Sequence, residues 1–415
     1  MTDFIRACAT AAFLIATAGV PAFAASYLVR PGGSLQSVGA ALAAAAAGDT
    51  ITVEAGSYRE HSLRIDKPLV LLGQGRPVID AAGMGPLIEI TADGVTIEGF
   101  VFRNVPRSHV KENAAILVNR AAEAEIRENS FEDCFFAIYL SKAGRCRILG
   151  NDISGARTEV TGAGNGIHLW YCRDIAVHGN SVRGHRDGIY LEFVKNSVMT
   201  GNDSSRNFRY GLHFMFSDSC RYEDNRFRGN GSGVAVMYTR HVEMTGNTFA
   251  ENWGGASYGL LLKDIRDSRV HGNEFVSNSV GIHMEGSDRI ELDSNCFVGN
   301  GWAIKIMANC VDSKISDNDF IDNSFQVATN SRQTFSRFER NYWSSYRGYD
   351  LDRDGYGDEP YRPVSLYSLL VESEPATLVL VRSLLVEVLN LAERVVPTLT
   401  PAALIDSHPR MRPVT

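Results

Sequence analysis

The sequence predicts an all-β protein: a right-handed parallel β-helix with an N-terminal cap and a C-terminal helical tail. The first observation is an asparagine that recurs every 22 to 29 residues, at Asn129, Asn151, Asn180, Asn202, Asn225, Asn247, Asn273, Asn295, Asn318 and Asn341. The second is a column of small-then-apolar segments between them, such as "GIHL", "GIYL", "GLHF" and "GVAV". The third is the absence of helical periodicity between the two. Short strand-like segments bounded by Gly or Asn turns at this period are typical of one coil of a β-solenoid.

The recurrent asparagines have a structural interpretation. Successive coils of a solenoid stack about 4.8 Å apart, so equivalent side chains form ladders. Stacked asparagines can hydrogen-bond one another, and asparagine tolerates left-handed backbone angles in turns. We therefore expect two strand-like segments per coil, with the asparagines stacked at the turns and without a catalytic or metal-binding role.

The two ends of the chain differ from the repeats. Residues 1–24 have the charge, apolar stretch and "AFA" site of a signal peptide, which predicts export. Residues 25–345 form the predicted β-helix, which begins with an alanine-rich helix and a strand as its cap. Residues 346–415 form an acidic loop and a helical tail, "ATLVLVRSLLVEVLNLAERVVP", which either caps the solenoid or docks on a partner.

Composition excludes some classes of function. The net charge of -7 argues against nucleic acid as a partner, because such surfaces are usually basic. The cysteines form no CxxC pair, so the sequence contains neither a zinc-ribbon nor a redox motif. After the signal peptide, no apolar run reaches the roughly 18 residues that a transmembrane helix needs.

Strand alternation predicts an unusual outer face. One set of positions in the second column is apolar throughout and should point inward, whereas the alternate set contains imidazole, thioether, carboxylate and aromatic groups. The candidate metal ligands on this outer face are His168, Cys172, His213, Met215, Met237 and His283. Met215 and Met237 should be neighbours on adjacent coils, with His213 beside Met215. Thioether and imidazole together favour Cu(I).

Two alternatives use the same face. Exposed Met and Trp side chains could form an apolar protein-docking patch that the histidines merely border. The segment "HRDGIYLE" could instead supply His185, Arg186, Asp187, Tyr190 and Glu192 to a lyase or epimerase that acts on an acidic polysaccharide.

The segment "DLDRDGYGD" resembles the first half of a calcium loop. Asp350, Asp352 and Asp354 alternate before Gly355, and Asp358 follows. Tyr361 stands where an EF-hand has its bidentate glutamate, so the loop is incomplete. It is predicted to be either a calcium-stabilised loop or a hydrated acidic turn.

Taken in order, these segments resemble the NosD family. The resemblance rests on "NGIHLWYCRDI", "HRDGIYLEF", "RYGLHFMFSDS", "VAVMYTRHVEMTGN", "GLLLKDIRDS" and "NYWSSYRGYDLDRDGYGDEPYRPV" with its following helix. It implies a non-enzymatic periplasmic accessory protein for nitrous oxide reductase maturation.

The implied partners are the permease and ATPase subunits of an ABC transporter, a lipoprotein copper chaperone and the reductase itself. The family is also tied to sulfur supply for the four-copper cluster of the reductase. The resemblance supplies no ligand residues, so the copper assignment rests on strand parity alone.

Overall fold

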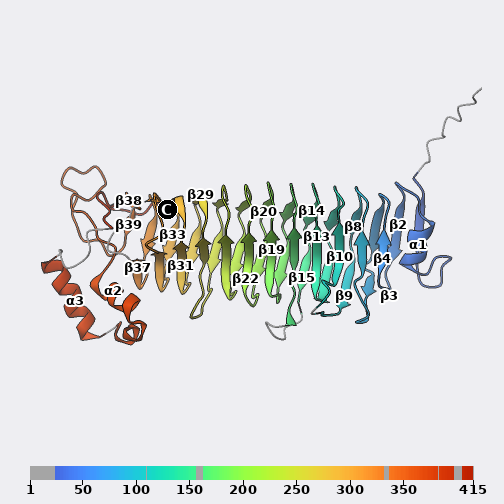
Figure 1. Ribbon diagram of the computed structural model, residues 1–415, viewed down its shortest axis with the longest axis horizontal. Coiled ribbons are helices and arrows are strands. Elements are labelled where there is room, and N and C mark those ends of the chain that lie inside the picture. The colour runs from blue at the N-terminus through green and yellow to red at the C-terminus, as the bar shows by residue number, and fades with distance from the viewer. Residues whose placement is uncertain are drawn as a thin grey trace, which may run out of the picture.

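The structure is a computed structural model that describes residues 24–108, 110–155, 162–330, 336–381, 383–396 and 404–414. The predicted signal peptide lies outside the described residues apart from Ala24. The chain winds into a long solenoid of stacked coils (Figure 1), so the predicted parallel β-helix is confirmed. All strand pairs between coils are parallel within the three sheets of 14, 12 and 13 strands.

The 14-stranded sheet comprises β1(Ser26–Val29), β2(Thr50–Glu54), β5(Val70–Gln74), β8(Thr96–Glu98), β11(Glu125–Arg127), β14(Arg147–Leu149), β17(Ala176–His178), β20(Val198–Thr200), β23(Arg221–Glu223), β26(Glu243–Thr245), β29(Arg266–His271), β32(Asp288–Asp293), β35(Lys314–Ser316) and β38(Arg337–Glu339). Each coil contributes one strand to this sheet, and apart from the cap strand β2 these strands were not predicted from the sequence. Most of its strands have three residues with one buried side chain, which is too short for alternation to be recognised.

The 12-stranded sheet comprises β4(Leu63–Ile65), β7(Ile88–Ile90), β10(Ala114–Asn119), β13(Phe136–Ser141), β16(Ile167–Trp170), β19(Asp187–Glu192), β22(Tyr210–Met215), β25(Ser232–Met237), β28(Leu260–Lys263), β31(Val280–Glu285), β34(Trp302–Ile306) and β37(Phe325–Ala328). The 13-stranded sheet comprises β3(Ser57–Arg59), β6(Val78–Asp80), β9(Val101–Val105), β12(Ser130–Cys134), β15(Asp152–Ser154), β18(Ser181–Arg183), β21(Asp203–Ser205), β24(Arg226–Arg228), β27(Thr248–Ala250), β30(Glu274–Val276), β33(Cys296–Val298), β36(Asp319–Ile321) and β39(Tyr342–Trp343).

Apolar ladders fill the interior of the solenoid. Phe227, Phe249, Phe275, Phe297, Phe320 and Trp343 stack ring on ring along the 13-stranded sheet. The inward positions predicted for the 12-stranded sheet, including Met284, are also buried in the core. The small residue at or near the start of each of these strands has a steric reason: a Cβ at Gly211, in β22, would lie 2.8 Å from the carbonyl oxygen of Gly233 in the next coil.

The predicted asparagine ladder is present and fully buried. From Asn129 to Asn318, each side-chain Nδ2 donates to Oδ1 of the asparagine in the next coil, at 2.9 to 3.2 Å. These asparagines do not use their tolerance of left-handed backbone angles. The residue before each one adopts them instead, as at Glu128, Gly150 and Asp224. The buried amide therefore joins the coils, while its neighbour makes the bend.

A second buried ladder was not predicted. It links successive coils through the side-chain oxygen of the next asparagine; the donor is Nδ2 except between Asn230 and Asn252, where it is the Asn230 backbone N–H. Its members are Asn207, Asn230, Asn252, Asn278, Asn300 and Asn323. The signal was present in the sequence, because these asparagines recur every 22 to 26 residues just before the strands of the 12-stranded sheet.

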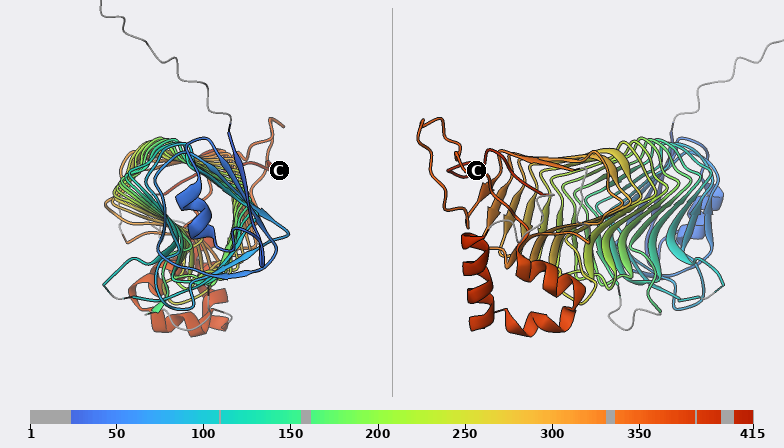
Figure 2. Two further views of the ribbon diagram at one scale, coloured as in Figure 1. Left: turned by 90° about the vertical axis from the view of Figure 1, so that its right-hand side faces the viewer. Right: turned by 60° about the vertical axis from the view of Figure 1, so that its left-hand side comes forward.

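The N-terminal cap is the predicted helix, α1(Val38–Ala44), followed by β2. The Ser37 hydroxyl accepts from the Ala40 N–H, and the Glu60 carboxylate accepts from the first two helical N–H groups. These contacts satisfy donors that a helix start leaves free. The helix lies across the open end of the solenoid (Figure 2).

The tail contains three short helical segments in place of one predicted helix: α2(Leu366–Ser373), η2(Pro375–Leu380) and α3(Leu384–Val395). They lie beside the last coils (Figures 1 and 2), where Tyr367 and Val371 pack with Trp302 and Phe325. Across the described part of the chain, no helix combines the length and apolar character needed to cross a membrane.

The chain then returns to the solenoid and closes the first asparagine ladder. The Asp406 carboxylate is fully buried and accepts from Asn341 N–H, Asn341 Nδ2 and Trp343 Nε1 at 2.9 to 3.1 Å. It also accepts from the Arg340 N–H at 3.1 Å. Residues 404–414 therefore form a clasp over the last coil.

Candidate functional site

The predicted register is present, but four of the seven side chains in the first outward column, those of His168, His213, Ala235 and Leu261, are buried. We name the two outward columns of the 12-stranded sheet the outer stripe. The first column contains His168, Tyr190, His213, Ala235, Leu261, His283 and Lys305, and the second contains Trp170, Glu192, Met215, Met237, Lys263 and Glu285. Residues that are distant in sequence are therefore direct neighbours on this face.

The methionine pair occupies the middle of the stripe. Met215 and Met237 are direct partners across β22 and β25, and both side chains are partly exposed. The Tyr190 hydroxyl donates to the Met215 sulfur at 3.5 Å. Glu192 precedes the pair in the column, and the Lys263–Glu285 ion pair, 3.4 Å between charged atoms, follows it. The two thioethers thus lie between Glu192 on one side and Lys263 on the other, on a partly exposed face.

His213 is much more deeply buried than its predicted place on the outer face implied. Its side chain is only 1% exposed, and its ring packs against Tyr190 and Tyr210 with centroids 4.9 and 4.7 Å away. Its Nδ1 lies 3.5 Å from a carboxylate oxygen of Asp187, which is also buried. Burial lowers the pKa of His213, although Asp187 opposes that shift. The imidazole is therefore neutral at neutral pH.

The Asp187 contact determines which nitrogen of His213 is available. When Nδ1–H faces the carboxylate, Nε2 presents a lone pair, and Nε2 is buried without a hydrogen-bond partner in the structure. A carboxylate behind one ring nitrogen is the usual way in which a metal-binding histidine is oriented. From the sequence, Asp187 was expected to be either a turn residue or part of a polysaccharide site. Its contact with His213 was not predicted.

The other two histidines do not share a site with the methionine pair. His168 lies two strands before His213, with Tyr190 between them, and burial lowers its pKa to about 4. His283 lies three strands beyond His213, about 14 Å at the usual strand spacing. One ion cannot bind Met215 together with His168 and His283.

The prediction that Cys172 lies on the outer face is wrong. Strand parity placed it on the outer face, but β16 ends at Trp170 and Tyr171 adopts a left-handed φ of 52°. That bend turns Cys172 into the core, where its thiol donates to the carbonyls of Leu140 and Trp170 at 3.3 Å. Burial raises its pKa to about 11, which keeps the thiol protonated. Cys172 is a core residue and no longer a candidate ligand.

An exposed ladder of aromatic rings borders the methionine pair. It consists of Tyr171, Phe193, Phe216 and Tyr238, which stack with centroids 4.5 to 5.1 Å apart. All four have positive φ, which is unfavourable for a bulky residue, whereas earlier coils place Arg120 and Lys142 there. The rings directly follow Trp170, Glu192, Met215 and Met237. This aromatic ladder was not predicted, and it enlarges the apolar surface around the thioethers.

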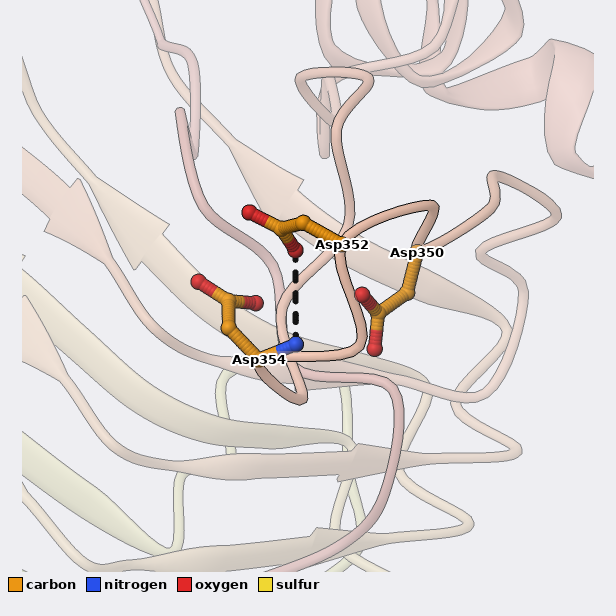
Figure 3. A group of neighbouring side chains, drawn as sticks. All are labelled: Asp350, Asp352 and Asp354. Carbon is orange, nitrogen blue, oxygen red and sulfur yellow. Dashed lines mark hydrogen bonds between the residues drawn. The ribbon is translucent and has the colours of Figure 1, made fainter.

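The acidic loop partly matches its prediction. One carboxylate oxygen each of Asp350, Asp352 and Asp354 lies within 4.8 Å of the others (Figure 3). Backbone N–H groups of the loop donate to these carboxylates, as Asp354 N–H does to Asp352. Asp358 is not in the cluster: its carboxylate accepts from the Leu351 N–H at 2.7 Å and closes the loop instead.

Fold and stripe together define a class: a parallel β-helix with imidazole, thioether and charged side chains in register on one sheet. The chain belongs to the NosD family. The family model, described as "Periplasmic copper-binding protein (NosD)", matches residues 150–350 and so spans the whole methionine region.

Two curated relatives cover nearly the whole chain. A probable ABC transporter binding protein NosD of Pseudomonas aeruginosa is 34% identical over 87% of this chain and 88% of its own. The protein of the same name from Stutzerimonas stutzeri is 29% identical over 86% of each.

Solved structures show likeness in fold. PfbA, a surface adhesin of Streptococcus pneumoniae, is 12% identical with a TM-score of 0.54, over 76% of this chain and 91% of that one. The alginate lyase AlyF-OU02 is 11% identical with a TM-score of 0.51, over 74% and 88%. An adhesin and a lyase on one architecture show that the coil itself does not determine activity.

Proposed function

We propose that this chain is a periplasmic factor of nitrous oxide reductase maturation that binds Cu(I) at His213, Met215 and Met237 and passes it between partner proteins. It acts as a binding protein and not as an enzyme. The cargo is copper; a role in sulfur supply is the alternative that the family allows. The family description and the soft donor atoms in the middle of the outer stripe both support this function.

The observation that carries the proposal is the buried Asp187–His213 pair. Its geometry leaves one imidazole nitrogen without a hydrogen bond, two positions before Met215 on the same strand face, and imidazole together with thioethers is selective for Cu(I). The two thioethers are partly exposed, which suits a carrier because a partner can supply the next ligand there. The aromatic ladder beside the methionines offers that partner an apolar contact surface.

Replacing His213 with phenylalanine is expected to weaken Cu(I) binding by at least roughly 10-fold, because it removes a ligand and keeps a ring in an aromatic site. The measurement is a competition titration with bicinchoninate under reducing conditions. His178→Phe is the matched control, since His178 is exposed on the 14-stranded sheet. Equal affinities for the two variants would remove His213 from the site.

The polysaccharide alternative has less support from this geometry. Its proposed acid–base residues include His185 and Asp187, which are only 2% and 1% exposed. A polymer lying on the sheet would not reach them. Turnover of alginate or pectin by the purified protein would nevertheless establish an enzymatic role and displace the carrier proposal.

The tail is the proposed contact for the transporter's permease subunit, through which the chain associates with the ATPase. Leu384, Val388, Leu391 and Val395 form one stripe along α3, and they are 54% to 81% exposed. A continuous exposed apolar helix face indicates a protein contact. The clasp at residues 404–414 follows this helix, so substitutions test the stripe better than truncation does.

Leu384→Glu combined with Leu391→Glu is expected to reduce co-purification with the permease and ATPase subunits at least 10-fold. Two carboxylates would enter an interface that is otherwise apolar. Val110→Glu is the control, because Val110 is 93% exposed and lies near the other end of the solenoid. Undiminished co-purification of the double variant would exclude α3 as the main anchor.

Calcium binding at Asp350, Asp352 and Asp354 remains a separate proposal. A bound ion would stabilise the folded state by roughly RT ln(1 + [Ca²⁺]/Kd), which is about 2.7 kcal/mol at 100 times Kd. Millimolar Ca²⁺ should raise the Tm, and EDTA should reverse the rise. Asp352→Asn should abolish the response. A Tm that does not respond to Ca²⁺ identifies the loop as a hydrated turn.

A further inference from the structure

A cavity of about 510 Å³ lies where the tail meets the last coils. One wall comes from the sheet face at β31, β34 and β37, a second from the loop at residues 253–258, and a third from the end of η2. That loop is the insertion that lengthens one asparagine interval to 26 residues. The tail helices approach this side of the solenoid in Figure 2. The cavity is separate from the outer-stripe methionines, which lie on earlier coils.

Most of the lining is apolar. Trp302 stacks on Phe325 with centroids 4.0 Å apart, and Val280 lies beside them. Leu378 and Val381 close the tail side, although they are still 46% and 39% exposed. The volume lies within the range of about 300 to 1,000 Å³ that is usual for small-molecule sites. An apolar ligand body would fit between the sheet and η2.

Two polar side chains converge at one wall of this cavity. His283 and Lys305 are direct partners on adjacent strands. The Lys305 Nζ lies 2.8 Å from a Glu372 carboxylate oxygen and 4.4 Å from the Trp302 ring centroid. An ammonium group has three N–H donors, and the Glu372 contact uses one.

His283 supplies the second polar contact. Its ring packs on Tyr258 with centroids 4.9 Å apart, and its Nδ1 is buried without a hydrogen-bond partner in the structure. A buried polar atom in that state is unfavourable unless a ligand or water satisfies it. Burial and then the Lys305 charge lower the pKa of His283, so the ring is neutral and can donate from Nδ1.

We propose that this cavity binds an amphipathic monocarboxylate, with the apolar body between Trp302, Val280 and Val381 and the carboxylate accepting from Lys305 Nζ and His283 Nδ1–H. Pockets of this kind combine mainly apolar walls with a few oriented polar groups. The bound molecule would touch both the coils and η2, and so would hold the tail against the solenoid. This site is additional to the copper site and does not depend on it.

The test uses decanoate as the carboxylate probe and 1-decanol as its uncharged analogue, each titrated calorimetrically into the full chain. Decanoate should bind at one site, at least 10-fold more tightly than 1-decanol. Val381→Trp, which fills the cavity from the tail side, should weaken decanoate binding at least 10-fold. Leu378→Trp serves the same purpose if the first variant does not fold.

Two further variants test whether Lys305 recognises the carboxylate of decanoate. Lys305→Met with Glu372→Gln removes the ion pair without leaving a buried charge, and it should abolish the preference for decanoate over 1-decanol. Glu372→Gln alone should keep that preference. Leu391→Glu, on the exposed stripe of α3, should bind decanoate as the wild type does.

Several results would overturn this inference: no saturable decanoate binding, equal binding of decanoate and 1-decanol by the wild type, or unchanged binding by both cavity-filling variants. Cu(I) affinity, measured in parallel, should be the same with and without decanoate. Failure of the copper site would therefore leave this test intact, and the reverse also holds.

Discussion

Replacing Asp406 with alanine is expected to lower the free energy of unfolding by roughly 3 kcal/mol or more. Its buried carboxylate accepts hydrogen bonds from the side chains of Asn341 and Trp343 and from three backbone N–H groups. Alanine would leave the donors of Asn341 and Trp343 buried and unsatisfied, and each such donor costs about 1 to 3 kcal/mol. The last rung of the asparagine ladder would also lose its partner.

Equilibrium urea unfolding of the two proteins measures this effect. Asp203→Ala is the matched control, because Asp203 is an exposed strand residue and its replacement should change stability by about 0.5 kcal/mol or less. Asp406→Asn should fall between the two, since an amide keeps one acceptor oxygen. Equal stabilities for the Asp406→Ala and Asp203→Ala variants would show that the clasp does not stabilise the solenoid.

Removing both thioethers from the outer stripe is expected to reduce Cu(I) affinity by about 100-fold or more. Met215→Ala with Met237→Ala removes two of three proposed ligands, and even changes behind a ligand typically reduce affinity 10- to 100-fold. Both side chains are partly exposed, so the fold should be preserved. The measurement is the competition titration described for His213, with binding stoichiometry determined at the same time.

Met84→Ala is the control for this loss. Met84 is 71% exposed on an early coil, far from the stripe, and should bind Cu(I) only weakly. Its replacement should leave both affinity and stoichiometry unchanged. If the double variant also retains wild-type values, the ions bind elsewhere and the outer stripe is better explained as a docking surface.

The repeating coils were largely predictable from the sequence, because the same asparagine spacing and strand alternation recur from coil to coil. The intervals of the ladder from Asn129 to Asn341 predicted the coil, and strand alternation then predicted the pairing of Met215 with Met237. Alternation failed at Cys172 because one left-handed residue, Tyr171, reverses parity and lies outside the strand. A period-2 pattern carries no information about such a bend.

The less predictable features depend on contacts across coils or across the whole chain. The burial of His213 comes from Tyr190 and Tyr210 on two strands, and its orientation comes from Asp187 one coil earlier. The Asp406 clasp joins residues 65 positions apart. Neither follows from local spacing. The aromatic ladder could have been recognised, because each ring immediately follows a residue of the second stripe column.

We propose that two thioethers and one imidazole of the outer stripe bind Cu(I). The most direct measurement is copper K-edge X-ray absorption on the Cu(I)-loaded full chain, compared with the Met215→Ala, Met237→Ala variant. We predict sulfur scatterers together with one imidazole in the wild type, and loss of the sulfur shell in the variant. A first shell of nitrogen and oxygen alone, or a sulfur shell that persists in the variant, would contradict the claim.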